Sequence, residues 1–220
     1  MRGLAVTLAL LAAASPAVAQ HQHDPDQTPA HAHAMGIPDG WQARLDRASA
    51  TLSDVHAMQM DDHLHVMTGP ALILWQPETT ATGAYRAHAS FTLNKPSAHP
   101  EAFGLILGGH DLEGPDQDYL YFLVRQDGKF LVKHRAGDAE THTLFEWTEN
   151  DAIHRPGDDG TATNELAMDV SEAGVRFLVN GTEVARLDRV SYLNTEGIVG
   201  LRVNHNLDVM VRDFGVAPAP

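Results

Sequence analysis

The stretch that decides the fold class is DYLYFLVRQDGKFLVK, residues 118–133. Its first half alternates between apolar side chains and tyrosines, which is the period of two expected of a β-strand that turns one face to an apolar interior. The positions predicted to face that interior are Leu120, Phe122 and Val124. Asp127-Gly128 favours the positive φ angles of a tight primed turn, so the two halves are predicted to form a β-hairpin.

The same pattern continues on both sides of this hairpin. In residues 175–187, Asn180-Gly181 separates two further apolar runs and predicts a second hairpin. Strand and turn signals recur about every eight to twelve residues, which is typical of a sandwich or barrel. We therefore predict an all-β fold, a two-sheet antiparallel β-sandwich of roughly 12–14 strands. Helical periodicity is weak, and only residues 42–53 are predicted to carry a turn or two of helix.

The first nineteen residues have the composition of an export signal. Arg2 supplies a positive charge, residues 4–14 form an apolar run, and Ala17-Val18-Ala19 fits the small-x-small rule for signal-peptide cleavage. The run is shorter than the ~20 apolar residues that cross a bilayer, and no later stretch is long and apolar enough to do so. We expect a cleaved bacterial-type signal peptide over residues 1–19, export to the periplasm or the medium, and no membrane span.

The segment that follows has too few large apolar side chains to fold. Residues 21–40 read HQHDPDQTPAHAHAMGIPDG, rich in His and Pro. Such a segment cannot bury enough surface to offset its chain entropy, so residues 20–40 are predicted to be a disordered His-rich lead. Residues 41–217 are predicted to form one β-sandwich domain, whose hydrophobic content is ample for a core because the whole chain is 43% hydrophobic.

Charge and cysteine content exclude several functions. The chain has 15 Lys and Arg against 29 Asp and Glu, a formal net charge of -14, and such an acidic surface repels phosphate backbones. Nucleic acid is therefore not an expected partner, whereas neutral small molecules and glycans are. The absence of Cys excludes disulfides, thiol nucleophiles and thiolate metal sites.

The C-terminal part carries a recognisable order of residues. Residues 164–214 contain N-x-L, then F-x-V-N-G-x-x-V, then G-x-x-G-L-R, and end on V-x-x-x-x-F. This order resembles concanavalin A-like lectin/glucanase domains, including LamG-like modules and the domains named after 3-keto-disaccharide hydrolases, over about residues 71–216. The resemblance implies a jelly roll, in a superfamily that holds lectins, glycosidases, adhesion modules and spacers. The E-x-D-x-(x)-E catalytic strand of its glucanases is absent; residues 146–151, EWTEND, come nearest but in the wrong order.

A ligand-binding face follows from the alternation. If Leu120 and Leu201 face the core, the side chains beside them face the other way. That side would carry Tyr119, Tyr121, Arg202 and Asn204. Aromatic rings with a few amide and guanidinium donors suit a neutral sugar, because ring faces stack and hydroxyls pair. The alternative is that these are ordinary strand residues and a solvated arginine.

Three His-x-His pairs raise the possibility of a metal site. One pair lies on a predicted strand, where residues two apart share a face, so His63, His65 and Met67 are candidate copper ligands. His56, Met58 and Met60 form a similar series just upstream. The alternative is an exposed His pair with methionines that pack in the core.

An acidic loop is the candidate for calcium. Its four carboxylates are Asp111, Glu113, Asp116 and Asp118. Calcium takes several oxygen ligands, although the spacing is not that of an EF-hand, so such an ion would support the fold. The alternative is a solvated loop. Neither calcium nor copper is required by any motif, and no other cofactor is expected.

Acid–base catalysis has only isolated candidates, His110, Asp111 and His205, because a His beside a carboxylate can act as a base. No G-x-S-x-G nucleophile elbow and no phosphate loop occur. The first hypothesis is an exported, non-catalytic binding module for a glycan or glycoside. The alternatives are a hydrolase acting on sugar derivatives, which the resemblance allows, and a periplasmic copper- or zinc-handling protein.

Overall fold

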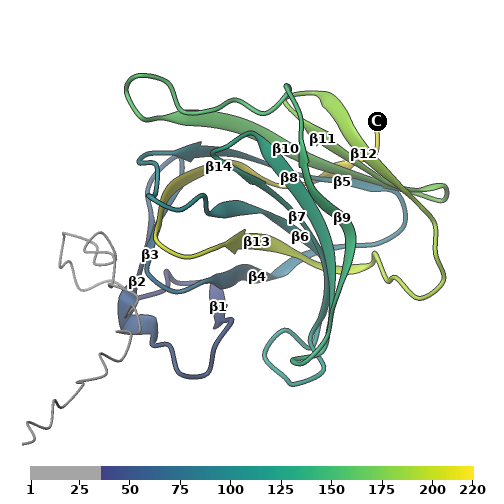
Figure 1. The fold of residues 1–220 in the computed structure, drawn as a ribbon. Coiled ribbons are helices and arrows are strands. Elements are labelled where there is room, and N and C mark those ends of the chain that lie inside the picture. The colour runs from purple at the N-terminus through teal and green to yellow at the C-terminus, as the bar shows by residue number, and fades with distance from the viewer. Residues whose placement is uncertain (1–35) are drawn as a thin grey trace, which may run out of the picture.

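The computed structural model describes residues 36–220 (Figure 1). The predicted signal peptide and most of the His-rich lead lie outside these residues. Residues 36–220 form fourteen β-strands and one short 3-10 helix, η2 (Leu52–Asp54). That part of the chain holds no helix of the length and hydrophobicity needed to traverse a bilayer.

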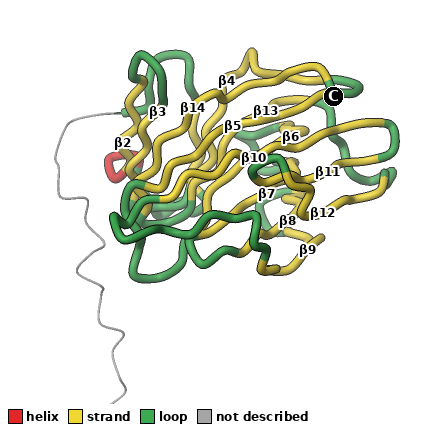
Figure 2. The backbone as a smooth tube through the Cα atoms, turned by 90° about the horizontal axis from the view of Figure 1, so that it is seen from above, coloured by secondary structure: helices red, strands yellow, loops and turns green. Residues whose placement is uncertain are grey.

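The strands form two antiparallel sheets of seven (Figure 2). The first sheet has the order β1 (Gln42–Leu45), β4 (Leu72–Ala81), β13 (Gly197–Val203), β6 (Ala102–His110), β7 (Asp118–Arg125), β8 (Lys129–Ala136) and β9 (Thr141–Glu149). The second has the order β12 (Thr182–Asp188), β11 (Gly174–Val179), β10 (Ala162–Ser171), β5 (Tyr85–Leu93), β14 (Leu207–Pro218), β3 (Leu64–Thr68) and β2 (Val55–Gln59).

The apolar interior lies between the two sheets, as the alternation predicted. Leu120, Phe122 and Val124 of β7 are fully buried in it. The two layers meet ring to ring, because Phe122 of the first sheet lies 5.3 Å from Phe177 of the second, measured between ring centroids. Each such side chain contributes about 1.5–3 kcal/mol by leaving water. The predicted two-sheet sandwich is therefore confirmed.

Two local predictions had different outcomes. Asn180 and Gly181 have φ angles of 49° and 77° and join β11 to β12 as the predicted primed turn. The Asp127-Gly128 turn is not a primed pair. Only Gly128 has positive φ, 81°, and its N–H donates to the Arg125 carbonyl, which is the three-residue hairpin loop with a left-handed glycine.

Residues 42–53 contain a strand where helix was expected. Residues 42–45 form β1, which pairs with β4 along the edge of the first sheet, and only residues 52–54 form a 3-10 turn. Pairing with β4 gives this backbone its hydrogen bonds, and that outweighs a weak local helical preference.

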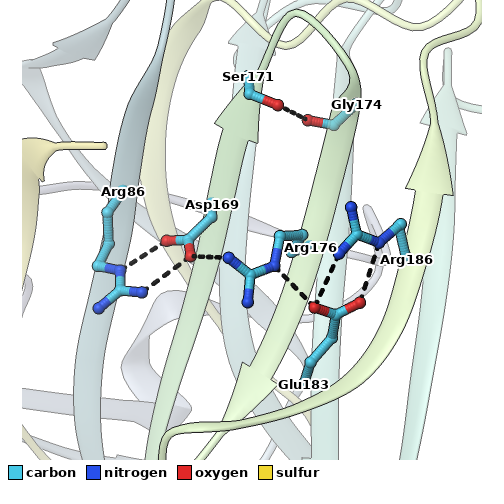
Figure 3. A network of polar contacts seen from close by, with 7 residues as sticks. All are labelled: Arg86, Asp169, Ser171, Gly174, Arg176, Glu183 and Arg186. Atoms are coloured by element: carbon cyan, nitrogen blue, oxygen red, sulfur yellow. Dashed lines mark hydrogen bonds and ion pairs between the residues drawn. The ribbon is translucent and has the colours of Figure 1, made fainter. Parts of the chain in front are cut away.

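A chain of ion pairs crosses the outer face of the second sheet (Figure 3). Arg86 donates to both carboxylate oxygens of Asp169, at 2.6 and 2.8 Å. Arg176 lies 3.6 Å from Asp169 and donates to Glu183 at 2.7 Å, and Arg186 donates to both oxygens of Glu183. These ion pairs therefore link the neighbouring strands β5, β10, β11 and β12.

Candidate functional site

The outer face of the first sheet carries a second apolar cluster. Its buried members are Ile73, Trp75, Ala102, Ile106, Leu112, Tyr119, Tyr121, Leu123 and Leu131. They alternate with the residues of the interior, so each central strand is covered on both sides. The face that was expected to be available to a ligand is thus largely filled by the protein's own side chains.

Arg202 lies at the centre of this face and is 6% exposed. Its Nη1 donates to Asp46 Oδ1 at 2.9 Å, and its Nη2 donates to Asp46 Oδ2. Nη1 also lies 3.3 Å from the Tyr119 hydroxyl, and the guanidinium carbon lies 5.0 Å from the ring centroid of Tyr121. The structure therefore brings three of the four predicted ligand residues together around one guanidinium.

The pKa values in this group reflect burial and charge. Burial alone would raise the pKa of Asp46, but the charge and hydrogen bonds of Arg202 outweigh it and hold that pKa below its ordinary value. Burial opposes the charge of Arg202, yet Tyr119 and Asp46 raise its pKa. Burial raises the pKa of Tyr121. At neutral pH the group thus holds the carboxylate of Asp46, the guanidinium of Arg202 and the neutral phenol of Tyr121.

A strap from β1 closes over the same face. Arg44 Nη1 donates to the carbonyls of Leu112, at 3.0 Å, and of Gly114, and Nη2 pairs with Asp138 at 2.6 Å. Four strands separate β1 from β8 in the sheet order, which would be about 24 Å on a flat sheet. An arginine cannot span that distance, so the contact shows that the sheet curves and that its loops fold over this face.

A hollow of about 190 Å³ opens beside the Arg202–Asp46 pair. It is lined by Asp46, Arg47, Ser49, Ala50, Pro70, Ala71 and His205, and we call it the Asp46 hollow. The side chain of Asp46 is 22% exposed, whereas that of Arg202 is 7% exposed. The carboxylate is thus the solvent-facing end of the buried pair.

Asn204, the fourth predicted ligand residue, lies in the turn between β13 and β14. Its backbone N–H donates to the Ala102 carbonyl at 2.9 Å. Its side-chain Oδ1 is buried without a hydrogen-bond partner among the described residues, as is Nε of Arg202. Sequence reasoning missed Asp46, since no motif marks it and its partner lies 156 residues away.

The three catalytic candidates do not share one site in this structure. His110 lies beside Glu196 at the start of β13, and His205 lies just past the end of that seven-residue strand. A strand of this length separates them by roughly 20 Å. Asp111 instead accepts a hydrogen bond from the Asp116 N–H within its own loop. His110 and His205 therefore do not lie together in one site.

Within residues 36–220, no three His, Asp or Glu side chains are placed to hold a metal ion together. His63 pairs with Asp62 and His65 pairs with Asp208, each at 2.7 Å. Their rings lie 6.4 Å apart. Met67 is half-buried on the same face as His65.

The acidic loop is tied to other partners. Asp111 accepts from the Asp116 backbone, and Asp118 pairs with His134 at 3.0 Å. Glu113 and Asp116 complete the four carboxylates of the calcium prediction, and no shared oxygen cage is formed by them in the described chain.

Neither protein-family models nor curated proteins match the sequence. Solved structures do. The carbohydrate-binding module CBM66 from Bacillus subtilis superposes with a TM-score of 0.59 at 9% identity, over 81% of this chain and 95% of that chain. The fold is a concanavalin A-like jelly roll.

Two further jelly rolls of similar likeness were solved with sugars. The VIP36 exoplasmic/lumenal domain, in a Ca²⁺- and Man3GlcNAc-bound form, gives a TM-score of 0.57 at 9% identity, over 82% of this chain and 84% of that chain. A Bacteroides ovatus GH16 protein in complex with a G4G4G3G product gives 0.55 at 9% identity, over 81% and 96%. At this identity the likeness is one of fold.

Proposed function

We propose that the chain is an exported, non-catalytic jelly-roll module that binds a neutral glycan or glycoside at the Asp46 hollow. The observation that carries the proposal is the carboxylate of Asp46, held by a buried arginine and presented to a hollow. A carboxylate offers about four acceptor positions, and Arg202 uses two of them. The remaining positions suit the hydroxyls of a sugar.

The lining of the hollow complements that carboxylate. Arg47, Ser49 and His205 supply donors, and Pro70 and Ala71 supply apolar surface for a sugar ring. At about 190 Å³, the hollow is smaller than the ~300–1,000 Å³ of pockets that enclose a drug-sized ligand. It therefore favours one sugar ring or a chain end over an enclosed oligosaccharide.

Arg202, Tyr119 and Tyr121 act in this proposal as positioning residues beneath the hollow. Arg202 fixes Asp46 in one orientation and keeps it charged, and the two tyrosines hold Arg202, so little ordering is needed when a ligand binds. The sequence features of residues 1–19 support export.

A glycan array with the mature chain tests the proposal, followed by calorimetry with the best ligand. Arg47→Ala and His205→Ala are expected to weaken binding at least about tenfold, the loss of one good polar contact. Arg189→Ala is the matched control, because Arg189 is exposed and lies outside the hollow. No binding across neutral glycans and no thermal shift by oligosaccharides would end the proposal. Release of a reducing end from the bound glycan would favour the hydrolase alternative.

A further inference from the structure

Two rows of side chains on the outer face of the second sheet bring together three methionines and two histidines. In one row, Met58 of β2 and Met210 of β14 stand directly opposite His65 of β3, one on each side. In the next row, His56 and Asp208 flank Met67 in the same way. Directly opposed residues have Cβ atoms about 4.5–5.5 Å apart, which long side chains bridge easily.

The methionines in these rows do not pack in the interior. The alternating residues Ala57, Val66 and Val209 are buried between the sheets, so the two rows face the other way. Met58, Met67 and Met210 are half-buried on that outer face. Among the described methionines, Met168 alone is fully buried in the core. Core packing, the ordinary reason for a methionine on a strand, does not apply here.

His65 is oriented as a metal ligand is. Its Nε2 lies 2.7 Å from Asp208 Oδ1, and Asn94 donates to the same oxygen at 2.7 Å. In the neutral tautomer that donates from Nε2 to this carboxylate, the lone pair of the ring is on Nδ1. A histidine that donates its other ring N–H to a carboxylate is the usual arrangement around a bound metal, where the carboxylate raises the basicity of the ligand.

His56 has a nitrogen with no partner. Its Nδ1 is buried and makes no hydrogen bond with any described residue. A buried polar atom left unpaired costs about 1–3 kcal/mol, so an unpaired ring nitrogen beside two thioethers is a further sign of a missing partner.

We propose that the His–Met patch, which comprises His56, Met58, His65, Met67 and Met210, binds a cuprous ion. Thioether sulfur is a soft donor that selects Cu(I), and imidazole suits copper as well. His65 with Met58 and Met210 supplies one nitrogen and two sulfurs in a single row across three strands. His56 and Met67 lie in the adjoining row. The patch lies on the second sheet, apart from the residues that line the Asp46 hollow, and the inference does not depend on glycan binding.

This arrangement revises the metal prediction made from the sequence. Residues two apart on one strand suggested His63, His65 and Met67. The register adds donors from β2 and β14, which no spacing along the sequence could show. His63 lies outside both rows and pairs with Asp62, which also pairs with Arg212 at 3.2 Å.

Competition with a chromophoric Cu(I) chelator under reducing conditions tests the proposal on the full mature chain. The wild-type chain is expected to withdraw copper from the chelator. Met58→Leu/Met210→Leu and His65→Gln are expected to bind at least about tenfold more weakly, and Asp208→Asn about 10–100-fold more weakly. Met168→Leu and His99→Gln are the matched controls and should leave the copper affinity unchanged. Met168 lies in the core, and His99 is exposed and lies outside the patch.

X-ray absorption at the copper edge gives a second readout, the loss of sulfur in the double methionine variant, which the lead cannot mimic because it is the same in both proteins. The wild type is expected to show sulfur in the copper shell, and the double methionine variant is expected to lose it. Leucine replaces methionine at nearly constant volume, so folding is preserved, and circular dichroism verifies this. Equal copper affinity in the wild type and the double variant, or a shell of nitrogen and oxygen alone in the wild type, would overturn the proposal.

Discussion

Arg202 and Asp46 lie 156 residues apart in the sequence and form a bidentate ion pair on the outer face of the first sheet. The guanidinium is buried against Tyr119 and Tyr121, while the carboxylate is partly exposed to solvent. The two charges of the pair are therefore solvated unequally. The guanidinium is shielded from water and is compensated by Asp46, whereas the carboxylate also has access to water.

This asymmetry predicts unequal costs for the two truncations. Asp46→Ala leaves a buried guanidinium unpaired and is expected to lower the free energy of unfolding by about 3 kcal/mol. Arg202→Met leaves a carboxylate that water can reach and is expected to cost about 1–2 kcal/mol. Urea denaturation of both variants and of the double variant measures this. The double variant should lose less unfolding free energy than the sum of the losses in the two single variants. Strictly additive losses would show that Arg202 and Asp46 are not energetically coupled.

The same pair predicts a dependence of stability on acid pH. The pKa of Asp46 is lower in the folded chain than in the unfolded one, so the unfolded state binds the proton first as pH falls. The stabilisation by Asp46 is present above about pH 4, the ordinary range of an Asp, and is lost as the pH falls through the folded pKa. Asp46→Asn should lack this component, so the difference in unfolding free energy between it and the wild type should shrink as the pH falls from about 5 towards the acid limit. A deficit that stays constant with pH would contradict the assignment.

The alternation of β7 predicted the faces of the first sheet correctly. Leu120 and Phe122 lie in the interior and Tyr119 and Tyr121 lie opposite, because a strand with a covered face has only one register that buries its apolar side chains. Periodicity says which way a side chain points and not what lies over it. The apolar cluster around Tyr119 includes Leu112 from a loop, and the carbonyl of Leu112 accepts a hydrogen bond from Arg44 at the far edge of the sheet.

The candidate sites were less predictable than the faces for a related reason. Asp46 follows a four-residue strand in a segment without periodicity, and its role exists only because β1 pairs with β4. Met210 likewise joins His65 only through the pairing of β14 with β3. Spacing along one strand predicts same-face neighbours within that strand, and contacts between strands depend on a topology that a single sequence does not display.

The ion-pair chain on the second sheet predicts a stability difference between its two acids. Asp169 has a 6% exposed side chain and accepts two hydrogen bonds from Arg86, so Asp169→Asn should lower the free energy of unfolding by about 1.5–3 kcal/mol. Glu183 is solvated on the edge strand β12, and Glu183→Gln should leave the urea midpoint nearly unchanged. An equal loss of unfolding free energy in both variants would mean that the ion pairs stabilise the fold through their total charge and not through the buried carboxylate.

The Asn180 turn predicts a separation of backbone and side-chain effects. Asn180 has a positive φ of 49°, accepts from the Glu165 N–H, and donates to Ala152 and Asn164. Asn180→Gly removes the side-chain hydrogen bonds, but glycine adopts a positive φ without strain. Asn180→Ala removes the same hydrogen bonds and also strains the backbone, so the free energy of unfolding of the alanine variant should be about 1 kcal/mol lower than that of the glycine variant. Thermal denaturation of the two variants compares them directly, and the reverse order would contradict a left-handed residue at this position.

The Arg44 strap predicts that the cover over the tyrosines can be loosened separately from the fold. Arg44 ties β1 to the carbonyls of Leu112 and Gly114, and residues in such a loop open locally at a lower free energy than the core does. Arg44→Ala should therefore speed amide hydrogen exchange in residues 112–121 and leave residues 162–179 of the second sheet unchanged. Arg155→Ala, which removes an exposed pair with Glu149, is the control and should change neither region. Faster exchange throughout both sheets would show that Arg44 supports the global fold and not a local cover, and unchanged exchange in residues 112–121 would show that Leu112 holds the loop without the strap.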